Sequence, residues 1–348
     1  MGSNTQFVGM EEPVLITGAS GFVASHVLNA FLSRGYKVRG TVRSEEAANK
    51  VMSHSQYGNQ LSMVIVPDMA APNAFDEAVK GVSGVIHTAS PFALEVEDND
   101  RDLLQPAIQG TLNILEAISR HNPSVRRVVI TSSFASVLDL DRGFRPGYAY
   151  TEDDWNPCSY EIAKTTTNGS VAYCASKAFA ERGAWEWMSR HKPNFSIATI
   201  CPPWIFGPSA EKMQSLTRLN GSTETLYHLI DGSLTEVPAM DFAAFADVRD
   251  VAQAHLLSYE VKEAANQRFL VGGGYFDYQT ACDIIRANFP SLQEKTPKGT
   301  PGATKMGQTY ILDSSKAQTV LGLKYRSLES TLTDTVNCLL AAEKSIGN

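Results

Sequence analysis

The sequence predicts an α/β protein: a doubly wound parallel sheet with helices on both faces, followed by a smaller C-terminal region. Three observations support this prediction. Of the 348 residues, 43% are hydrophobic and 19% are charged, which is typical of a globular chain with a large core. Short apolar runs alternate with helical patterns through the first 200 residues. Beyond residue 201 this rhythm ends in a loop-rich stretch punctuated by Pro-Pro, Gly-Pro, Asn-Gly and Asp-Gly pairs.

The predicted strands and helices alternate in chain order. Apolar runs predict buried strands at residues 13–17, 36–42, 61–66, 84–87, 127–131 and 195–200. Helical periodicity predicts helices at 21–34, 103–120 and 171–190. We expect Pro106 to break the second helix early and Ser170 to cap the third. Further along, we expect helices at 248–259, 278–288 and 328–343, a strand at 268–271 and a Pro/Gly-rich loop at 297–302.

Charge and cysteine usage argue against several classes of partner. The net charge of −7 offers no basic excess to neutralise the phosphates of nucleic acid or of an acidic membrane. Five widely spaced cysteines without a CxxC pair predict free thiols in a reducing compartment and no metal cluster. The N-terminal residues do not resemble a signal peptide, and no apolar run is long enough to span a membrane. We therefore expect a cytoplasmic protein.

A glycine-rich turn links the first predicted strand to the first predicted helix. Gly18 allows a tight turn, Gly21 lets the backbone approach a pyrophosphate, and Ala24 is small enough for close packing of helix on sheet. The helix N-terminus adds backbone amides and the positive end of a dipole. This order of strand, turn and helix predicts a dinucleotide site. Its expected contacts are Gly18, Ser20, Gly21, Phe22 and Val23.

The end of the second predicted strand indicates which dinucleotide binds. An NAD site usually carries an acidic residue there for the ribose 2′-hydroxyl, but this strand ends in Arg43 with no acid before Glu45. A guanidinium suits a 2′-phosphate, and Lys50 on the following helix would add positive charge. Asp68, after the third strand, is a candidate for the adenine amino group, with an ordinary turn aspartate as the alternative. The predicted cofactor is NADPH.

Two Tyr-x-x-x-Lys pairs occur, and this spacing places both side chains on one helix face. Hydride reduction of a carbonyl needs an acid for the developing alkoxide, and tyrosine serves if a nearby lysine lowers its pKa. Tyr160 and Lys164 are expected at a loop edge, whereas Tyr173 and Lys177 open a strong helix. We expect the second pair to be catalytic, although either pair taken alone would suit an ordinary surface contact.

The fifth predicted strand ends in Thr131-Ser132-Ser133, at the edge that faces ligands in such sheets. A hydroxyl there can hydrogen-bond a carbonyl oxygen. Spacing does not choose between the two serines, and helix capping would explain one of them. His87, at the end of the fourth strand, is expected to be a packed residue rather than a base.

Together these motifs resemble the extended short-chain dehydrogenase/reductase family. Within it, the chain is similar to the fungal branch of methylglyoxal and aldehyde/carbonyl reductases, with dihydroflavonol reductases as more distant relatives. The matching stretches follow the family order: 18–26, 87–92, 101–104, 131–133, 155–157, 172–177, 205–208 and 247–252. The pair Pro203-Trp204 departs from the smaller-then-aromatic pair of the family.

The resemblance implies that the chain reduces an aldehyde or ketone with NADPH. It implies that Ser133 orients the carbonyl, that Tyr173 donates the proton, and that Lys177 lowers the tyrosine pKa and binds the nicotinamide ribose. The implied cofactor contacts are Arg43 and Lys50 at the 2′-phosphate, Thr88, Ala89 and Ser90 along the cofactor, and Pro202 beside the nicotinamide. Substrate contacts are expected at Phe92, Trp204 and Phe206, in an aromatic, weakly charged lining that suits a neutral carbonyl compound.

The domain division follows from these assignments. We expect an N-terminal extension at 1–12, an NADP-binding Rossmann domain mainly at 13–203 and a substrate-binding region mainly at 204–348, with 245–272 returning to the Rossmann core. The expected partner is a small-molecule carbonyl substrate, without nucleic acid or membrane, and the assembly considered is a homodimer. Two alternatives share the fold. One is a hydroxysteroid-type dehydrogenase or sugar epimerase, and the other is a non-catalytic NADPH-sensing protein.

Overall fold

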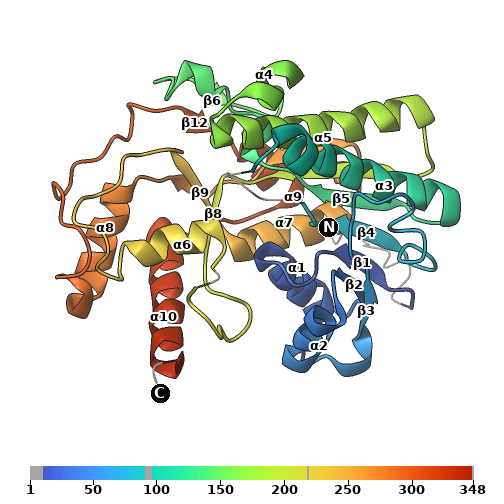
Figure 1. Cartoon of the computed structure of the whole chain (residues 1–348), viewed down its shortest axis with the longest axis horizontal. Helices are drawn as coiled ribbons and strands as arrows, with labels where there is room; N and C mark the ends of the chain where they lie inside the picture. Colours follow the sequence, from blue (N-terminus) through green and yellow to red (C-terminus); the bar gives the residue numbers. More distant parts are fainter. Residues whose placement is uncertain (1–10, 91–95, 218, 347–348) are drawn as a thin grey trace, which may run out of the picture.

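The computed structural model describes residues 11–90, 96–217 and 219–346, and its largest element is a parallel sheet of seven strands (Figure 1). These strands are β1 (Val14–Thr17), β2 (Val38–Val42), β3 (Leu61–Ile65), β4 (Gly84–His87), β5 (Arg127–Thr131), β7 (Ser196–Cys201) and β10 (Gln267–Leu270). They lie in the order β10-β7-β5-β4-β1-β2-β3. The chain runs from β1 to one edge, then crosses back to β4 and continues to the other edge. The predicted doubly wound sheet is confirmed.

Successive side chains of β1 point to opposite faces of the sheet and belong to two different hydrophobic cores. Ile16 belongs to a cluster with α1 (Phe22–Ser33), α7 (Val248–Glu260) and α9 (Ser315–Leu321). Leu15 belongs to a cluster with α3 (Gln105–His121) and α5 (Gly169–His191). Figure 1 shows α3 beside α5 and α1 beside α7. Because helices cover both faces, every residue of β1 is buried, which explains the unbroken apolar run in the sequence.

The C-terminal region builds a smaller sheet. β8 (Trp204–Phe206) pairs in parallel with β9 (Ala244–Asp247), and β9 pairs antiparallel with β11 (Gly274–Tyr275). α6 (Gly221–His228), α8 (Tyr278–Asn288) and α10 (Leu328–Ile346) pack a separate core against these strands. They gather at one end of the molecule, away from α2 (Glu45–His54) (Figure 1). Two short strands, β6 (Ala149–Tyr150) and β12 (Ile311–Leu312), form a third, parallel pair.

The segment 245–272 connects the two sheets. It begins in β9 of the small sheet, continues through α7 beside α1, and ends in β10 at the edge of the large sheet. The division into two domains stays a prediction. Residues 1–10 of the predicted N-terminal extension lie outside the described residues.

Three local predictions are wrong. Pro106 does not break a helix: it lies in the first turn of α3, where a missing N–H costs nothing, directly after a π-helical turn at Asp100–Leu104. Asn168 rather than Ser170 caps α5, because its side chain accepts hydrogen bonds from the first free backbone N–H groups of that helix. Tyr160 opens the short helix α4 (Tyr160–Thr165) instead of a loop edge.

All five cysteines carry free thiols. Within the described ranges, no helix combines the length and the apolarity that crossing a bilayer requires.

Candidate active site

The order of the strands reverses between β1 and β4, and open α/β sheets bind ligands at the carboxyl ends of the strands beside such a reversal. The glycine-rich turn follows β1, residues 88–90 follow β4, and Ser133 follows β5. The topology therefore brings three predicted contact segments to one edge of the sheet.

Gly18, the first glycine of the turn, has a backbone conformation that other residues adopt only with strain. Gly18 has φ +67°, and a Cβ atom there would lie 3.1 Å from the Cα atom of Ala89. Its N–H donates to the hydroxyl of Thr41 in β2. The turn is thus packed between β2 and the segment that follows β4.

The first turn of α1 leaves its amides without a side-chain cap. Gly21 is the N-cap and has no side chain to offer, and Ser20 and Gly21 are exposed. Phe22 and Val23 form the first turn, which carries no acidic residue. Exposed amides at the positive end of a helix dipole fit a pyrophosphate group.

The residues predicted for the adenosine half of the cofactor lie beyond β2 and β3. Arg43 follows β2 and is exposed, and its guanidinium has no hydrogen-bond or ion-pair partner among the described residues. Lys50 is exposed on α2. Asp68 accepts a hydrogen bond from the Ala70 N–H at 2.8 Å, which is the turn role considered as its alternative.

The Thr17 hydroxyl in β1 connects the ends of β1 and β4 and determines which form of the His87 ring is present. The oxygen of Thr17 accepts hydrogen bonds from the N–H groups of Thr88 and Ala89, both at 3.1 Å. With both lone pairs occupied, the hydroxyl proton is donated to His87 Nδ1 at 2.9 Å. Burial lowers the pKa of His87 to about 3. His87 is therefore neutral and packed, as expected, and is not a base.

The catalytic candidates from α5 and from the loop after β5 form one cluster. Lys177 Nζ donates to Ser90 Oγ at 3.2 Å and to the Thr131 carbonyl oxygen at 3.4 Å. Lys177 is 6% exposed, and desolvation lowers its pKa to about 8. Tyr173 lies one helical turn before Lys177, and its hydroxyl is a hydrogen-bond partner of the Ser133 side chain. Desolvation by burial raises the pKa of Tyr173 above its usual value, so the predicted lowering of that pKa by Lys177 is wrong.

The structure separates the two serines that spacing left open. Ser132 is buried, and its hydroxyl donates to Glu181 at 2.6 Å. Ser133 is partly exposed and caps the 3₁₀ turn Phe134–Ser136, its oxygen accepting from the Ala135 N–H at 3.1 Å. Capping is one role of Ser133, and its contact with Tyr173 distinguishes it from Ser132.

The other tyrosine–lysine pair is bound to an aspartate. The Tyr160 hydroxyl donates to Asp100, and Lys164 forms an ion pair of 2.9 Å with the same carboxylate. Lys164 is half-exposed on α4. Desolvation and Asp100 raise the pKa of Tyr160 to about 12. These contacts favour a surface network for the first pair.

The residues predicted beside the nicotinamide and the substrate occupy different environments. Pro202 is buried, and its carbonyl oxygen accepts from the Phe134 N–H at 2.8 Å. Trp204 is partly exposed, and its indole N–H donates to Asp241 at 3.1 Å. Phe92 lies outside the described residues.

The prediction that Phe206 contacts the substrate is wrong. Its side chain has 0% exposure and packs against Phe276, with ring centroids 4.9 Å apart, in the core beneath the small sheet. A side chain without accessible surface offers nothing to a ligand, so Phe206 is a core residue.

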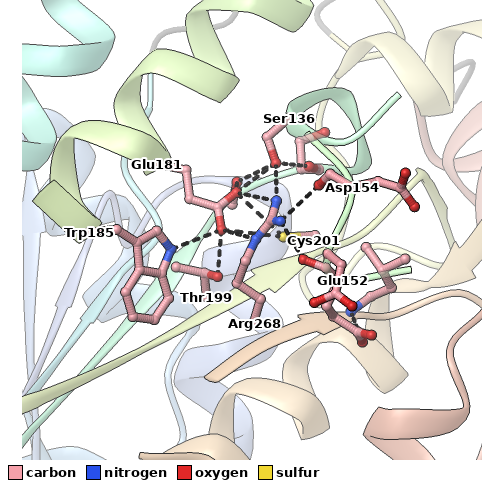
Figure 2. Close-up of polar contacts among 12 residues, drawn as sticks. Ser136, Glu152, Asp154, Glu181, Trp185, Thr199, Cys201 and Arg268 are labelled. Atoms are coloured by element: carbon pink, nitrogen blue, oxygen red, sulfur yellow. Dashed lines mark hydrogen bonds and ion pairs between the residues drawn. The ribbon is translucent and has the colours of Figure 1, made fainter. Parts of the chain in front are cut away.

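A buried ion pair that the sequence does not predict lies behind the serine loop. Arg268 Nε of β10 lies 2.8 Å from Glu181 Oε1 of α5 (Figure 2). The available signals were weak: a carboxylate four residues after Lys177 on one helix, and an arginine inside an apolar strand. Spacing alone does not connect two positions 87 residues apart.

Known proteins resemble this chain over most of its length. The model of the NAD dependent epimerase/dehydratase family matches residues 14–272. An uncharacterized oxidoreductase of Schizosaccharomyces pombe is 42% identical, over 94% of this chain and 96% of that protein. The NADPH-dependent methylglyoxal reductase of Saccharomyces cerevisiae is 35% identical, over 96% and 99%. The crystal structure of yeast methylglyoxal/isovaleraldehyde reductase complexed with NADPH matches with a TM-score of 0.90 at 34% identity, over 95% and 99%.

These matches extend across both sheets and agree with the motifs at the edge of the large sheet. The resemblance to the extended short-chain dehydrogenase/reductases is confirmed. The chain belongs to the NAD dependent epimerase/dehydratase family.

Proposed function

We propose that this chain is an oxidoreductase that reduces an aldehyde or a ketone to the alcohol with NADPH. The observation that carries the proposal is the cluster of Ser133, Tyr173 and Lys177 at the sheet edge that also holds the glycine-rich turn. The yeast methylglyoxal reductase above is NADPH-dependent by name, and the yeast structure above is of a methylglyoxal reductase complexed with NADPH. Both align over nearly the whole of both chains, which supports the transfer of their chemistry.

The residues present fit NADPH. The exposed amides at the start of α1 would hold the pyrophosphate, and Arg43 with Lys50 would hold the 2′-phosphate. Residues 88–90 and Pro202 would line the remaining length of the cofactor. When bound there, NADPH supplies the hydride.

The chain's own residues handle the carbonyl oxygen. Ser133 donates a hydrogen bond to that oxygen and orients it beside Tyr173. Tyr173 is protonated at neutral pH, because burial raises its pKa, and it donates its proton as negative charge develops on the oxygen. Lys177 carries its charge below about pH 8 and stabilises the tyrosinate that remains.

Turnover is expected to fall as Lys177 loses its proton. Its pKa of about 8 means that the ammonium is present at lower pH and is lost as pH rises through that value. We expect kcat/KM for the carbonyl substrate to be level at neutral pH and to decline above pH 8, measured by NADPH absorbance. Lys177→Arg removes the titrating group, so its residual activity should show no such decline. A decline at the same pH in that variant would contradict the assignment.

Arg43 is expected to select NADPH over NADH. Arg43→Ala should weaken NADPH binding by about 10- to 100-fold, the range of one to two charge-assisted hydrogen bonds, and leave NADH binding unchanged. Lys37→Ala is a matched control, because it removes an exposed positive charge just before the other end of β2. Titration of cofactor fluorescence measures both affinities. Equal weakening of NADPH and NADH binding would contradict this role.

Two other functions on this fold make different predictions. A sugar epimerase retains NAD, so nucleotide analysis of the purified protein would reveal tightly held NAD; Arg43 in place of an acid argues against this. A hydroxysteroid-type dehydrogenase would favour steroid alcohols. A sensor would bind NADPH without turnover, and the intact cluster around Tyr173 argues against it.

A panel of carbonyl substrates tests the proposal. We propose a neutral aldehyde, ketone or α-dicarbonyl compound such as methylglyoxal, the substrate named for a relative. NADPH and NADH consumption are measured separately with aliphatic, aromatic and α-dicarbonyl compounds, and turnover that favours NADPH is expected. NADPH binding without turnover across the panel would favour the sensor. We also propose a cytoplasmic location, in keeping with five free thiols, while a homodimer stays a prediction for analytical ultracentrifugation.

A further inference from the structure

Glu181 is a fully buried carboxylate surrounded by hydrogen-bond donors. It is 1% exposed. The hydroxyls of Ser132 and Ser136 each donate to Oε2 at 2.6 Å. Thr199 donates to Oε1 at 2.7 Å, and Arg268 Nε to the same oxygen at 2.8 Å. Figure 2 shows Ser136, Thr199 and Arg268 converging on the carboxylate. Burial alone would raise the pKa of Glu181, but the Arg268 charge and these hydrogen bonds lower it, so the carboxyl is ionised.

Arg268 is also buried, with 8% of its surface exposed. Its Nη1 donates to the carbonyl oxygens of Glu152 at 2.6 Å and Asp154 at 2.9 Å, and its guanidinium lies 3.6 Å from the centroid of the Trp155 ring. The guanidinium therefore donates its hydrogen bonds to groups of this chain, among them the Glu181 carboxylate (Figure 2). A buried ion pair contributes little net stability compared with an apolar packing, so its presence here calls for another role.

The position of Glu181 connects both halves of the candidate active site. It lies one helical turn after Lys177 on the same face of α5. Its partners Ser132 and Ser136 flank Ser133 in the loop after β5. Lys177, Ser132 and Glu181 also line one small, partly open pocket between α5 and the ends of β4 and β5. A single carboxylate thus joins the loop that carries Ser133 to the helix that carries Tyr173 and Lys177.

Glu181 also supplies the negative charge that faces Lys177. The titratable neighbours of Lys177 are Tyr173 and Glu181 on α5, His87 on β4 and Cys201 on β7, with Arg268 on β10 behind Glu181. His87 is neutral above about pH 3, and burial raises the pKa of Cys201 to about 12. Tyr173 is protonated at neutral pH. Among these neighbours, Glu181 is the anion at neutral pH, and it opposes the desolvation of the Lys177 ammonium.

We infer that Glu181, held by Arg268, is a positioning residue of the reductase site, which fixes the Ser133 loop against α5 and keeps Lys177 in its charged form. The inference rests on the proposed roles of Ser133, Tyr173 and Lys177. The two effects of Glu181 can be tested separately. Hydrogen bonds from serine hydroxyls hold the loop, whereas the negative charge of Glu181 favours the ammonium form of Lys177.

The pH profile of Glu181→Gln tests the effect of charge. Loss of the anion favours neutral Lys177, so the alkaline decline of kcat/KM should move to lower pH by about 1 unit or more. Thr199→Val is the matched control, because it removes one donor to the carboxylate and keeps its charge. Its decline should stay within about 0.3 unit of the unchanged protein. An unshifted decline in folded Glu181→Gln, or an equal shift in Thr199→Val, would overturn this part.

Ser136→Ala tests the positioning of the loop. It removes one hydroxyl that ties the loop to Glu181, so kcat should fall about fivefold or more while the alkaline decline stays in place. An unchanged kcat would overturn this part.

A second variant covers the case in which Glu181→Gln does not fold because Arg268 is left as an unpaired buried charge. The double variant Glu181→Gln/Arg268→Gln removes both charges, and its alkaline decline should move to lower pH as well. An unshifted decline in the folded double variant would overturn the inference. These results differ from a failure of the proposed function, in which the unchanged protein itself would show no NADPH-dependent turnover.

Discussion

Tyr173→Phe is expected to lose turnover by about a thousandfold, within the range measured for general acid catalysis, while NADPH affinity changes by about twofold or less. The substitution removes only the phenolic oxygen, so the packing of the ring on α5 is retained. What is lost is the hydroxyl proposed as the proton donor, beside Ser133 and Lys177. Steady-state NADPH oxidation measures the turnover, and cofactor fluorescence measures the affinity.

The protein contains its own control for this experiment. Tyr160→Phe removes the same atom from the same tyrosine–lysine spacing, but there the hydroxyl contacts Asp100. We expect turnover within about twofold of the unchanged protein, as for most surface substitutions. If Tyr160→Phe is inactive and Tyr173→Phe is active, the assignment of the two pairs is reversed.

Gly18→Val is expected to weaken NADPH binding by about 100-fold or more, the equivalent of about 2.7 kcal/mol. Two effects act together. The backbone at Gly18 has φ +67°, which a β-branched residue adopts with strain, and its Cβ atom would lie 3.1 Å from the Ala89 backbone. The turn must then shift, and with it the amides that we propose bind the pyrophosphate.

Gly81→Val separates backbone strain from the effect on the site. Gly81 has φ +63°, close to that of Gly18, but a Cβ atom there meets nothing within 4 Å. Both variants should lower thermal stability, because both place valine in the left-handed region. Only Gly18→Val should change the NADPH dissociation constant. Equal cofactor affinity in the two folded variants would contradict the role given to this turn.

Features that depend on neighbouring residues could be predicted from the sequence. The strands of the large sheet appear as apolar runs because helices cover both of its faces. Gly18 and Gly21 follow such a run directly, and Tyr173 and Lys177 share one helix, so their proximity is set within a few residues. The doubly wound fold and the candidate cluster follow from these local patterns.

Features that depend on distant residues could not be predicted. Ser132 and Ser133 are adjacent residues of the same type. What distinguishes Ser132 is its hydrogen bond to Glu181, 49 residues later in the chain, which holds it in the core. The Tyr160 hydroxyl donates its hydrogen bond to Asp100, 60 residues earlier in the chain. Phe206 is buried by Phe276 and the helices around it, although its sequence neighbours suggested a pocket wall. In each case the deciding contact comes from another element of the fold.

The most direct test of the central claim follows deuterium from the cofactor to the product. NADPH labelled with deuterium at C4 of the nicotinamide, in separate samples for its two faces, is supplied with an α-dicarbonyl or aldehyde substrate. We expect one of the two samples to give an alcohol with deuterium on the former carbonyl carbon, in step with NADPH oxidation, and Tyr173→Phe to form almost none. A protein that binds NADPH yet yields no labelled alcohol with either sample would contradict the central claim.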